Sequence, residues 1–216
     1  SVFAHDFVAN ESKFYSSCTV ADSIFAGNFT AASSYFNGPT NLYKNIFGGA
    51  TGFKEAEFDG PLYFEDIWFI GDSSINMKQR WARIKTIHNE FPSYSKISLP
   101  KKITDAYETR TPLSVFSLSF KDSIIPTTSC LTGIYLSCYG RYDFNTSDAK
   151  LSAAKFNLTS KDFTLGDGKV ISRTVPATFY IFDPDSWDKE KQKYTRMSKP
   201  TWPLDNSDNG EEDKTE

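Results

Sequence analysis

Apolar or small side chains recur along the first third of the chain at intervals that alternate between six and five residues. The series runs without a slip through Phe3, Ala9, Phe14, Val20, Phe25, Ala31, Phe36, Leu42, Phe47, Phe53, Phe58, Phe64, Phe69 and Ile75. Five successive units of this repeat carry glycine at their third position, namely Gly27, Gly38, Gly49, Gly60 and Gly71. A short fixed period over this length is typical of a solenoid, in which each coil buries its inner face by stacking on its neighbours.

A second order of repetition appears at twice that interval. The segment 36–46 matches the segment 58–68, and a Gly-Pro pair falls at the same place in both. The last position of alternate units is apolar, at Ile24, Ile46 and Trp68. The sequence therefore predicts coils of 22 residues with four sides of five or six residues each, and about three and a third coils over residues 3–75. We expect the solenoid core to contain Phe14, Phe25, Phe36, Phe47, Phe58 and Phe69.

Two other structures are compatible with parts of this pattern. An 11-residue period also suits a right-handed helical supercoil, but each interior glycine costs a helix about 1 kcal/mol and each proline about 3 kcal/mol. Ordinary antiparallel strands do not need a period that holds from residue 3 to residue 75. The pattern therefore favours the solenoid over both alternatives.

The segments 47–53 and 53–58 resemble pentapeptide-repeat proteins, especially their phenylalanine-rich members. In that family a large residue and a small residue two positions before it both point into a right-handed quadrilateral β-helix. The positions two before the apolar column are mostly small here, at Ser12, Cys18, Ser23, Ser34, Thr40, Thr51, Ala56 and Ser73. They are larger or bulkier at Phe7, Phe29, Asn45, Leu62 and Ile67. The resemblance covers residues 3–75 and implies a β-solenoid, but it implies no activity.

A helical period follows the repeat. Its apolar positions are spaced by four, three, four and three residues, at Met77, Trp81, Ile84, His88 and Phe91, which is one face of a helix. We expect one of residues 72–74 to cap its start and Pro92 to end it. The opposite surface is basic, with Lys78, Arg80, Arg83 and Lys85. That surface suits docking on a partner, while the apolar face suits plugging the open end of the solenoid, whose strand edges need cover.

The second half of the chain contains short β segments and turns. Residues 113–120 alternate strongly, and further candidate strands cover 131–142, 155–165, 169–175 and 177–182. Residues 166–168 form a Gly-Asp-Gly hairpin signal. Short strands at this spacing predict a β-sandwich or barrel-like module.

These patterns divide the chain into four parts. The predicted solenoid covers residues 1–75, and the capping helix with a proline-containing linker covers 76–112. The β-rich module covers 113–187 and a polar, acidic tail covers 188–216. The tail lacks the apolar residues for a core, and Trp202 in it is expected to anchor onto a neighbour or onto the chain itself.

The overall composition excludes several classes of partner. A formal net charge of −3 and a pI near 5.5 argue against a specific nucleic-acid binder. No stretch of the sequence is long and apolar enough to span a bilayer. The three cysteines form no CxxC motif, so a disulfide scaffold or cysteine zinc site is not expected. Cys130 and Cys138 either pair across a hairpin or are two buried thiols.

No set of residues indicates catalysis, a cofactor or a metal. The only histidines are His5 and His88, and neither has ligand residues at the usual spacing. The segment 183–188 contains three aspartates but lacks the glycine and the distal glutamate of a calcium loop. There is no GxSxG elbow and no glycine-rich phosphate loop. We therefore expect a protein that is not an enzyme, with no catalytic, cofactor-binding or metal-binding residues.

The leading hypothesis is a structural and binding protein in which a rigid β-solenoid carries a β-rich module. This layout is typical of components of virions, phages and cell-surface appendages, which favours an extracellular, surface or virion location. Protein partners in an assembly are expected, and a glycan is a further candidate ligand. Phenylalanine–glycine strands of this period also occur in trimeric shafts, so a monomeric coil and a homotrimer both remain open. The alternative is a β-helical enzyme acting on polysaccharide, or a carbohydrate-binding module.

Overall fold

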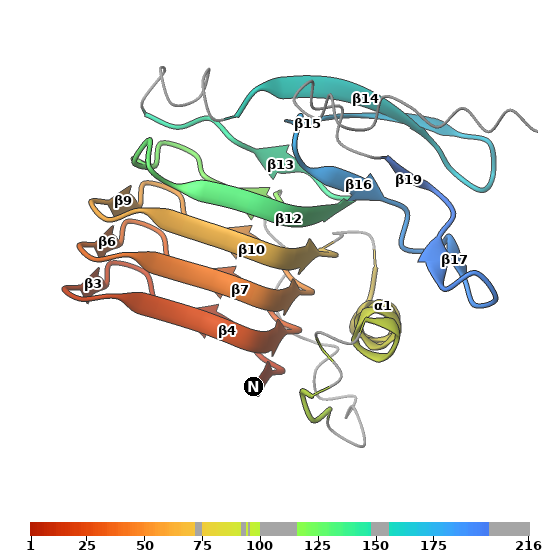
Figure 1. The fold of residues 1–216 in the computed structure, drawn as a ribbon, viewed down its shortest axis with the longest axis horizontal. Helices are drawn as coiled ribbons and strands as arrows, with labels where there is room; N and C mark the ends of the chain where they lie inside the picture. The colour runs from red at the N-terminus through yellow and green to blue at the C-terminus, as the bar shows by residue number, and fades with distance from the viewer. Residues whose placement is uncertain (72–74, 92–93, 95, 100–115, 148–155, 199–216) are drawn as a thin grey trace, which may run out of the picture.

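The computed structural model describes residues 1–71, 75–91, 94, 96–99, 116–147 and 156–198 of the chain. These residues form a β-solenoid of about five turns, with one helix against its flank (Figure 1). The strands of successive coils pair in parallel and build three sheets. The expected all-β fold, based on a β-solenoid with 22-residue coils, is confirmed.

The first coils contribute equivalent strands to the same three sheets. The largest sheet contains β1 (Val2–Phe3), β4 (Cys18–Phe25), β7 (Thr40–Phe47) and β10 (Leu62–Phe69). The second contains β2 (Phe7–Val8), β5 (Phe29–Thr30) and β8 (Thr51–Gly52). The third contains β3 (Lys13–Phe14), β6 (Tyr35–Phe36) and β9 (Glu57–Phe58). The sequence predicted four sides per coil, and the structure has three sheets. The difference arises because each eight-residue strand, β4, β7 or β10, runs along two consecutive sides.

The solenoid continues beyond residue 75. Four further strands pair in parallel with existing coils, namely β11 (Leu118–Ser119) with β8, β12 (Cys130–Ser137) with β10, β13 (Tyr142–Asp143) with β11, and β16 (Tyr180–Phe182) with β12. This corrects the expectation of a sandwich or barrel-like module over 113–187. Each of these strands forms parallel hydrogen bonds with the strand of the preceding coil, so the sheets of the repeat continue through this region.

Two hairpins and one strand project from the coils. β14 (Leu158–Thr164) and β15 (Val170–Pro176) pair in antiparallel fashion around the predicted turn at residues 166–168. β17 (Trp187–Asp188) and β18 (Lys193–Tyr194) form a smaller hairpin. β19 (Met197–Ser198) then pairs antiparallel to β16 and ends the largest sheet.

Left-handed residues explain how a five-residue step can join two inward-facing positions. Side chains of an extended strand alternate between its two faces, so an odd step reverses the face unless one residue departs from extended geometry. Residues with positive φ occur at 11-residue intervals over the repeat, at Glu11, Ser33 and Glu55 on one side and at Asp22, Lys44 and Asp66 on the other. Each lies within a five-residue step and restores the inward direction of the next apolar side chain.

The inner core consists of aromatic stacks that run along the solenoid axis. Phe25 stacks on Phe47 with 5.0 Å between ring centroids, and Phe47 stacks on Phe69 at 5.1 Å. Phe36 and Phe58 form a second stack at 4.6 Å. These five rings of the expected core are at most 3% exposed. The sixth, Phe14, is half-buried because it belongs to the first coil and stacks only on Phe36.

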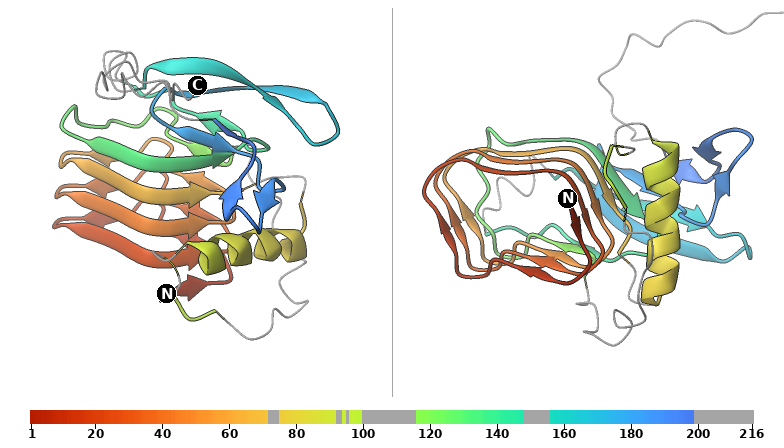
Figure 2. Two further views of the ribbon diagram at one scale, coloured as in Figure 1. Left: turned by 45° about the vertical axis from the view of Figure 1, so that its right-hand side comes forward. Right: turned by 90° about the horizontal axis from the view of Figure 1, so that it is seen from below.

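The helix α1 (Met77–Glu90) lies along the flank of the solenoid, which corrects the expectation that it plugs an open end. Figure 2 shows it beside the ring of coils, with the opening of the first coil uncovered by it. Its residues Trp81, Ile84 and Ile87 pack in one cluster with outward-facing side chains of successive coils. The helix lies on the flank because the outward-facing side chains there are apolar and pack against its own apolar face. Its N-cap is Asn76, whose side chain forms a capping box with Gln79, in place of the expected cap among residues 72–74.

The cysteines are free thiols. Cys130 begins β12 and Cys138 follows its last residue, so the two lie at opposite ends of one extended strand. Eight strand residues span roughly 26 Å, far beyond the reach of a disulfide. The pair across a hairpin is therefore wrong, and of the two buried thiols in the other interpretation only Cys138 is buried, because Cys130 is exposed. Burial raises the pKa of the Cys138 thiol to about 12, which keeps it protonated and unreactive at neutral pH.

Replacing Phe47 by Ala should lower the free energy of unfolding by about 3–5 kcal/mol, because it removes a ring that is packed between two others. Urea denaturation followed by circular dichroism measures the loss. Tyr15→Ala, at a side chain that is 72% exposed, is the control and should change stability little. Equal stability of the two variants would contradict an inward-facing phenylalanine stack.

Replacing Gly49 by Ala should also destabilise the protein, by about 1–3 kcal/mol or more. A Cβ at this corner would lie 2.2 Å from the carbonyl oxygen of Gly27 in the previous coil. Gly52→Ala is a matched control on the same coil, because its Cβ would approach no atom closer than 3.9 Å. Thermal unfolding of both variants tests the expectation, and a Gly49→Ala protein as stable as Gly52→Ala would show that the coils can separate at this corner.

Candidate functional site: an aromatic cleft on the flank

A single column of outward-facing side chains runs along the largest sheet. The register of the strands places Val2, Ile24, Ile46, Trp68, Tyr135 and Tyr180 in successive coils at equivalent positions. The column is aliphatic in the first coils and aromatic in the later ones. Because the strands are parallel and in register, each side chain of the column lies directly against the next.

Helix α1 covers the aliphatic part of this column. Trp81, Ile84 and Ile87 of the helix are buried together with Ile24 and Ile46. The helix is also held by Arg80, whose guanidinium is buried and donates a 2.8 Å hydrogen bond from Nη1 to the carbonyl oxygen of Ala26. The helical conformation ends at Glu90, and Phe91 continues in an extended conformation.

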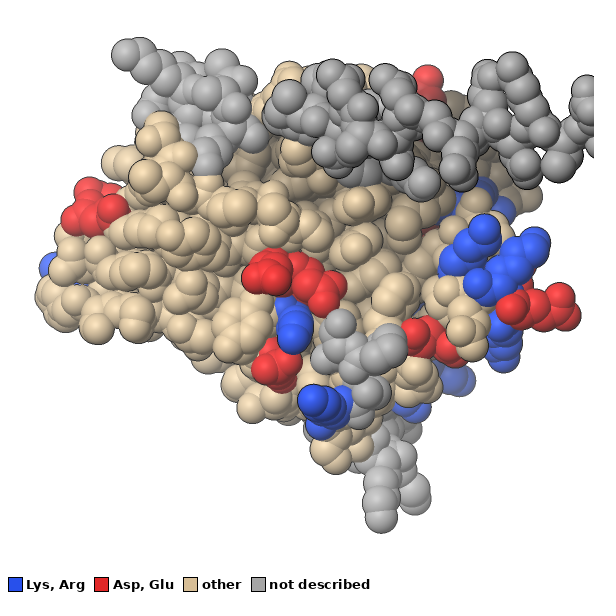
Figure 3. All heavy atoms as spheres, in the orientation of Figure 1, with Lys and Arg blue, Asp and Glu red and all other residues tan. Residues whose placement is uncertain are grey.

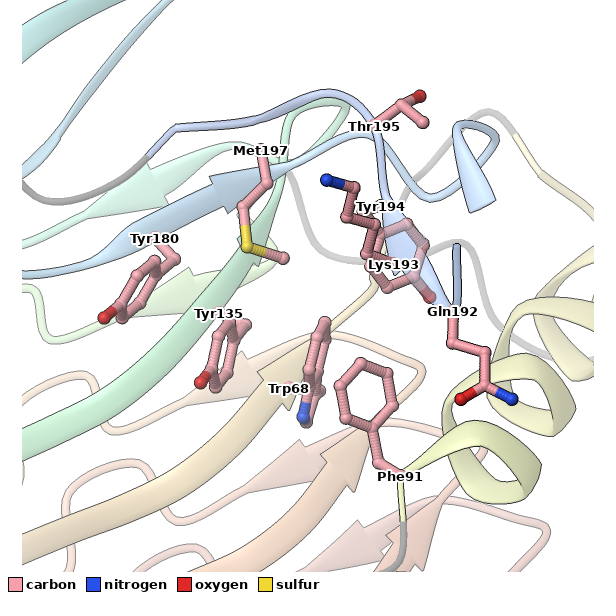
Figure 4. Close-up of a pocket in the computed structure, with 9 residues that line it drawn as sticks. All are labelled: Trp68, Phe91, Tyr135, Tyr180, Gln192, Lys193, Tyr194, Thr195 and Met197. Atoms are coloured by element: carbon pink, nitrogen blue, oxygen red, sulfur yellow. The ribbon is translucent and has the colours of Figure 1, made fainter. Parts of the chain in front are cut away.

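A cleft of about 460 Å³ opens where the aromatic part of the column passes the end of the helix. Its apolar lining consists of Trp68, Phe91, Tyr135, Tyr180, Tyr194 and Met197 (Figure 4). Its polar lining consists of Gln192, Lys193 and Thr195. Figure 4 shows Tyr180, Tyr135 and Trp68 in a row with Phe91 beside them, and Met197 on the other side of the cleft. The lining thus comes from three coils, the helix end and the C-terminal hairpin.

The rings of the row stack on one another along the solenoid axis. Trp68 and Tyr135 are nearly parallel, with 4.1 Å between their centroids and 8° between their planes. Tyr135 and Tyr180 stack at 4.9 Å and 20°. Both faces of the Tyr135 ring are therefore occupied by neighbouring rings, so it presents an edge to the cleft.

The C-terminal wall of the cleft is fastened by ionic contacts. Asp183 is fully buried and accepts hydrogen bonds from Arg196, whose Nε lies 2.7 Å from the carboxylate and whose Nη2 lies 2.6 Å from it. Arg83 of the helix contacts Asp185 at 3.1 Å and places its guanidinium 5.1 Å from the centre of the Tyr139 ring. These contacts hold the helix and the segment that carries Tyr194 and Met197 in fixed positions relative to the column.

Two tyrosines that line the cleft have raised pKa values. Burial, assisted by the charge of Asp66, raises the pKa of Tyr135. Burial also raises the pKa of Tyr194. Lys193 is the only Lys, Arg, Asp or Glu among the described residues that line the cleft. Figure 3 shows that both signs of charge are interspersed on the face in view and that much of the solenoid wall is uncharged.

The residues that the sequence suggested for partner binding have different surroundings. Lys78 and Lys85 are exposed on the helix, whereas Arg80 is buried and Arg83 is engaged with Asp185. Trp202 lies outside the described residues. None of the other four lines the cleft. The basic helix surface and the aromatic cleft are thus separate features.

The described residues contain no group of three or more His, Cys, Asp and Glu side chains arranged to hold a metal ion. Asp183, which belongs to the calcium-like segment of the sequence, is instead paired with Arg196. The Nε2 atom of His88 lies 2.6 Å from the carbonyl oxygen of Ile97. Within the described part of the chain, no helix is long and apolar enough to cross a membrane.

Comparison of the chain with protein-family models, with curated protein sequences and with solved structures gives no match. The structure therefore supports the β-solenoid itself, and the likeness of residues 3–75 to pentapeptide-repeat proteins stays a resemblance of sequence.

Replacing Arg196 by Met should lower the free energy of unfolding on the order of 3 kcal/mol, because it leaves the buried Asp183 carboxylate without its cationic partner. Arg141→Met, at an exposed arginine, is the control. Chemical denaturation of both variants tests this expectation. A loss no larger than that of the control would show that the Asp183–Arg196 pair does not hold the cleft wall.

Proposed function

We propose that the protein is a non-enzymatic structural and binding protein, in which a rigid β-solenoid presents the aromatic cleft to a ligand. The observation that carries this proposal is the change of one column from aliphatic to aromatic at the point where the helix ends. The isoleucines and Trp68 of the column are buried, whereas Tyr135 and Tyr180 stay partly exposed in a cleft of ligand size. Pockets of this size and lining are typical small-molecule sites.

The solenoid supports a structural role because its coils are joined by continuous parallel sheets and ring stacks. Solenoids offer extended surfaces to protein partners. We propose that this one is a component of a larger assembly, such as a virion, a phage or a cell-surface appendage, and that it associates with protein partners or with further copies of itself as a trimer. Each coil in the described part is closed by one chain, so a trimer would form by association of complete solenoids. Kinship with pentapeptide-repeat proteins belongs to the same proposal.

The proposal predicts that ligands bind the cleft without being transformed. A panel of small aromatic and aliphatic compounds and oligosaccharides can be screened by ligand-observed NMR against the intact chain. Bound compounds should be released by Tyr135→Ala, which removes the central ring of the row, and retained by Tyr15→Ala, an exposed tyrosine outside the cleft. Absence of any Tyr135-dependent ligand would contradict the binding role, and turnover of an oligosaccharide would contradict the non-enzymatic one.

A further inference from the structure

We infer that the ligand of the cleft is a small amphipathic anion, namely an apolar ring or chain that bears a carboxylate. This assignment rests on the proposed binding role and adds the chemical class of the ligand. The apolar body lies against the partly exposed Tyr135 and Tyr180, next to the buried Trp68, and the carboxylate faces Lys193.

The residues that line the cleft indicate that the ligand has an apolar body. Six of the nine lining side chains are aromatic or methionine, and a cavity of about 460 Å³ accommodates a single ring with a short chain. Met197 adds an unbranched and adaptable thioether on the side opposite the rings. A strongly hydrated ligand without an apolar surface would leave this lining poorly covered.

The orientation of the rings favours negative charge over positive charge. An aromatic ring is negative on its faces and positive at its edge. The faces of Tyr135 are covered by Trp68 and Tyr180, so its partly positive edge is what a ligand meets. Ammonium groups bind over ring faces, which are not available at this ring.

The same geometry disfavours stacking of a neutral sugar on Tyr135. Stacking of a pyranose on an aromatic residue also requires a free ring face. The central ring of the row offers none. A neutral glycan is therefore the alternative occupant that the experiment below must exclude.

The one basic side chain that lines the cleft suits an anion. Lys193 is the only ionised side chain among the lining residues, its side chain is exposed, and it extends toward Met197 in Figure 4. Three acids act on the tyrosines of the cleft without lining it: Asp66 acts on Tyr135, and Glu90 and Asp185 act on Tyr194, where Arg83 opposes them. The hydroxyl of Tyr94 donates to the backbone carbonyl oxygen of Asp66 at 2.5 Å and lies 3.3 Å from the Asp66 carboxylate.

Three probes of one shape and different charge test the inference on the intact chain: 3-phenylpropanoate, 3-phenylpropanamide and 3-phenylpropylamine. Isothermal titration calorimetry at low salt should rank the carboxylate first, roughly two- to fivefold tighter than the amide, as expected for an exposed ion pair. The amine should bind more weakly than the amide. The preference for the carboxylate should shrink as the ionic strength approaches about 1 M.

The variant Lys193→Gln should abolish the preference and leave the affinity for the amide unchanged. Lys189→Gln is the matched control, because Lys189 is an exposed lysine of the same hairpin connection that does not line the cleft. Equal binding of carboxylate and amide, or an unchanged preference in Lys193→Gln, overturns the anion assignment.

The outcome also separates the inference from the proposed function. If none of the three probes binds while a neutral oligosaccharide binds in a Tyr135-dependent manner, the anion assignment fails and the binding role stands. If no compound of any class binds through Tyr135, both fail.

Discussion

The spacing between paired β-strands governs this molecule. Successive coils lie one strand spacing apart, about 4.8 Å, so each side chain meets the equivalent side chain of the next coil. Phenylalanine therefore stacks on phenylalanine in the core, at 5.0 Å between Phe25 and Phe47. The corners accept glycine alone where backbones approach, as at Gly49 above Gly27. The same constraint stacks Trp68 on Tyr135 outside the core, and thus the candidate site follows from the spacing that builds the fold.

The repeat was predictable because its signals are local and periodic. The columns of phenylalanine, the corner glycines and the 22-residue match all lie within residues 3–75, without interruption. The continuation was not predictable, because a long insertion shifts the register. Leu62 pairs with Thr40, 22 residues earlier, whereas Leu118 pairs with Thr51, 67 residues earlier. Without the pairing partner, short strands and turns in this region resemble a sandwich or a barrel.

The cleft, too, was predictable from the sequence only in part. Ile24, Ile46 and Trp68 stood out in the sequence as apolar last positions of alternate units, which was a signal of an outward apolar column. Tyr135 and Tyr180 belong to that column only through the pairing of β10, β12 and β16. The apolar face of the helix was also visible, but periodicity does not tell whether such a face covers the end of a solenoid or its side. That choice depends on the outward column, and the sequence alone did not place the helix against it.

The insertions that hid the register also show how a solenoid of this kind can change. The helix enters between β10 and β11, and the β14–β15 hairpin enters between β13 and β16, while the ladder of the largest sheet continues through both. A corner thus tolerates a segment of almost any length, because the pairing of the coils does not depend on it. The walls of the cleft and the stacked coils are therefore built from separate segments of the sequence. New walls of different shape and charge could be exchanged at a corner without redesigning the frame.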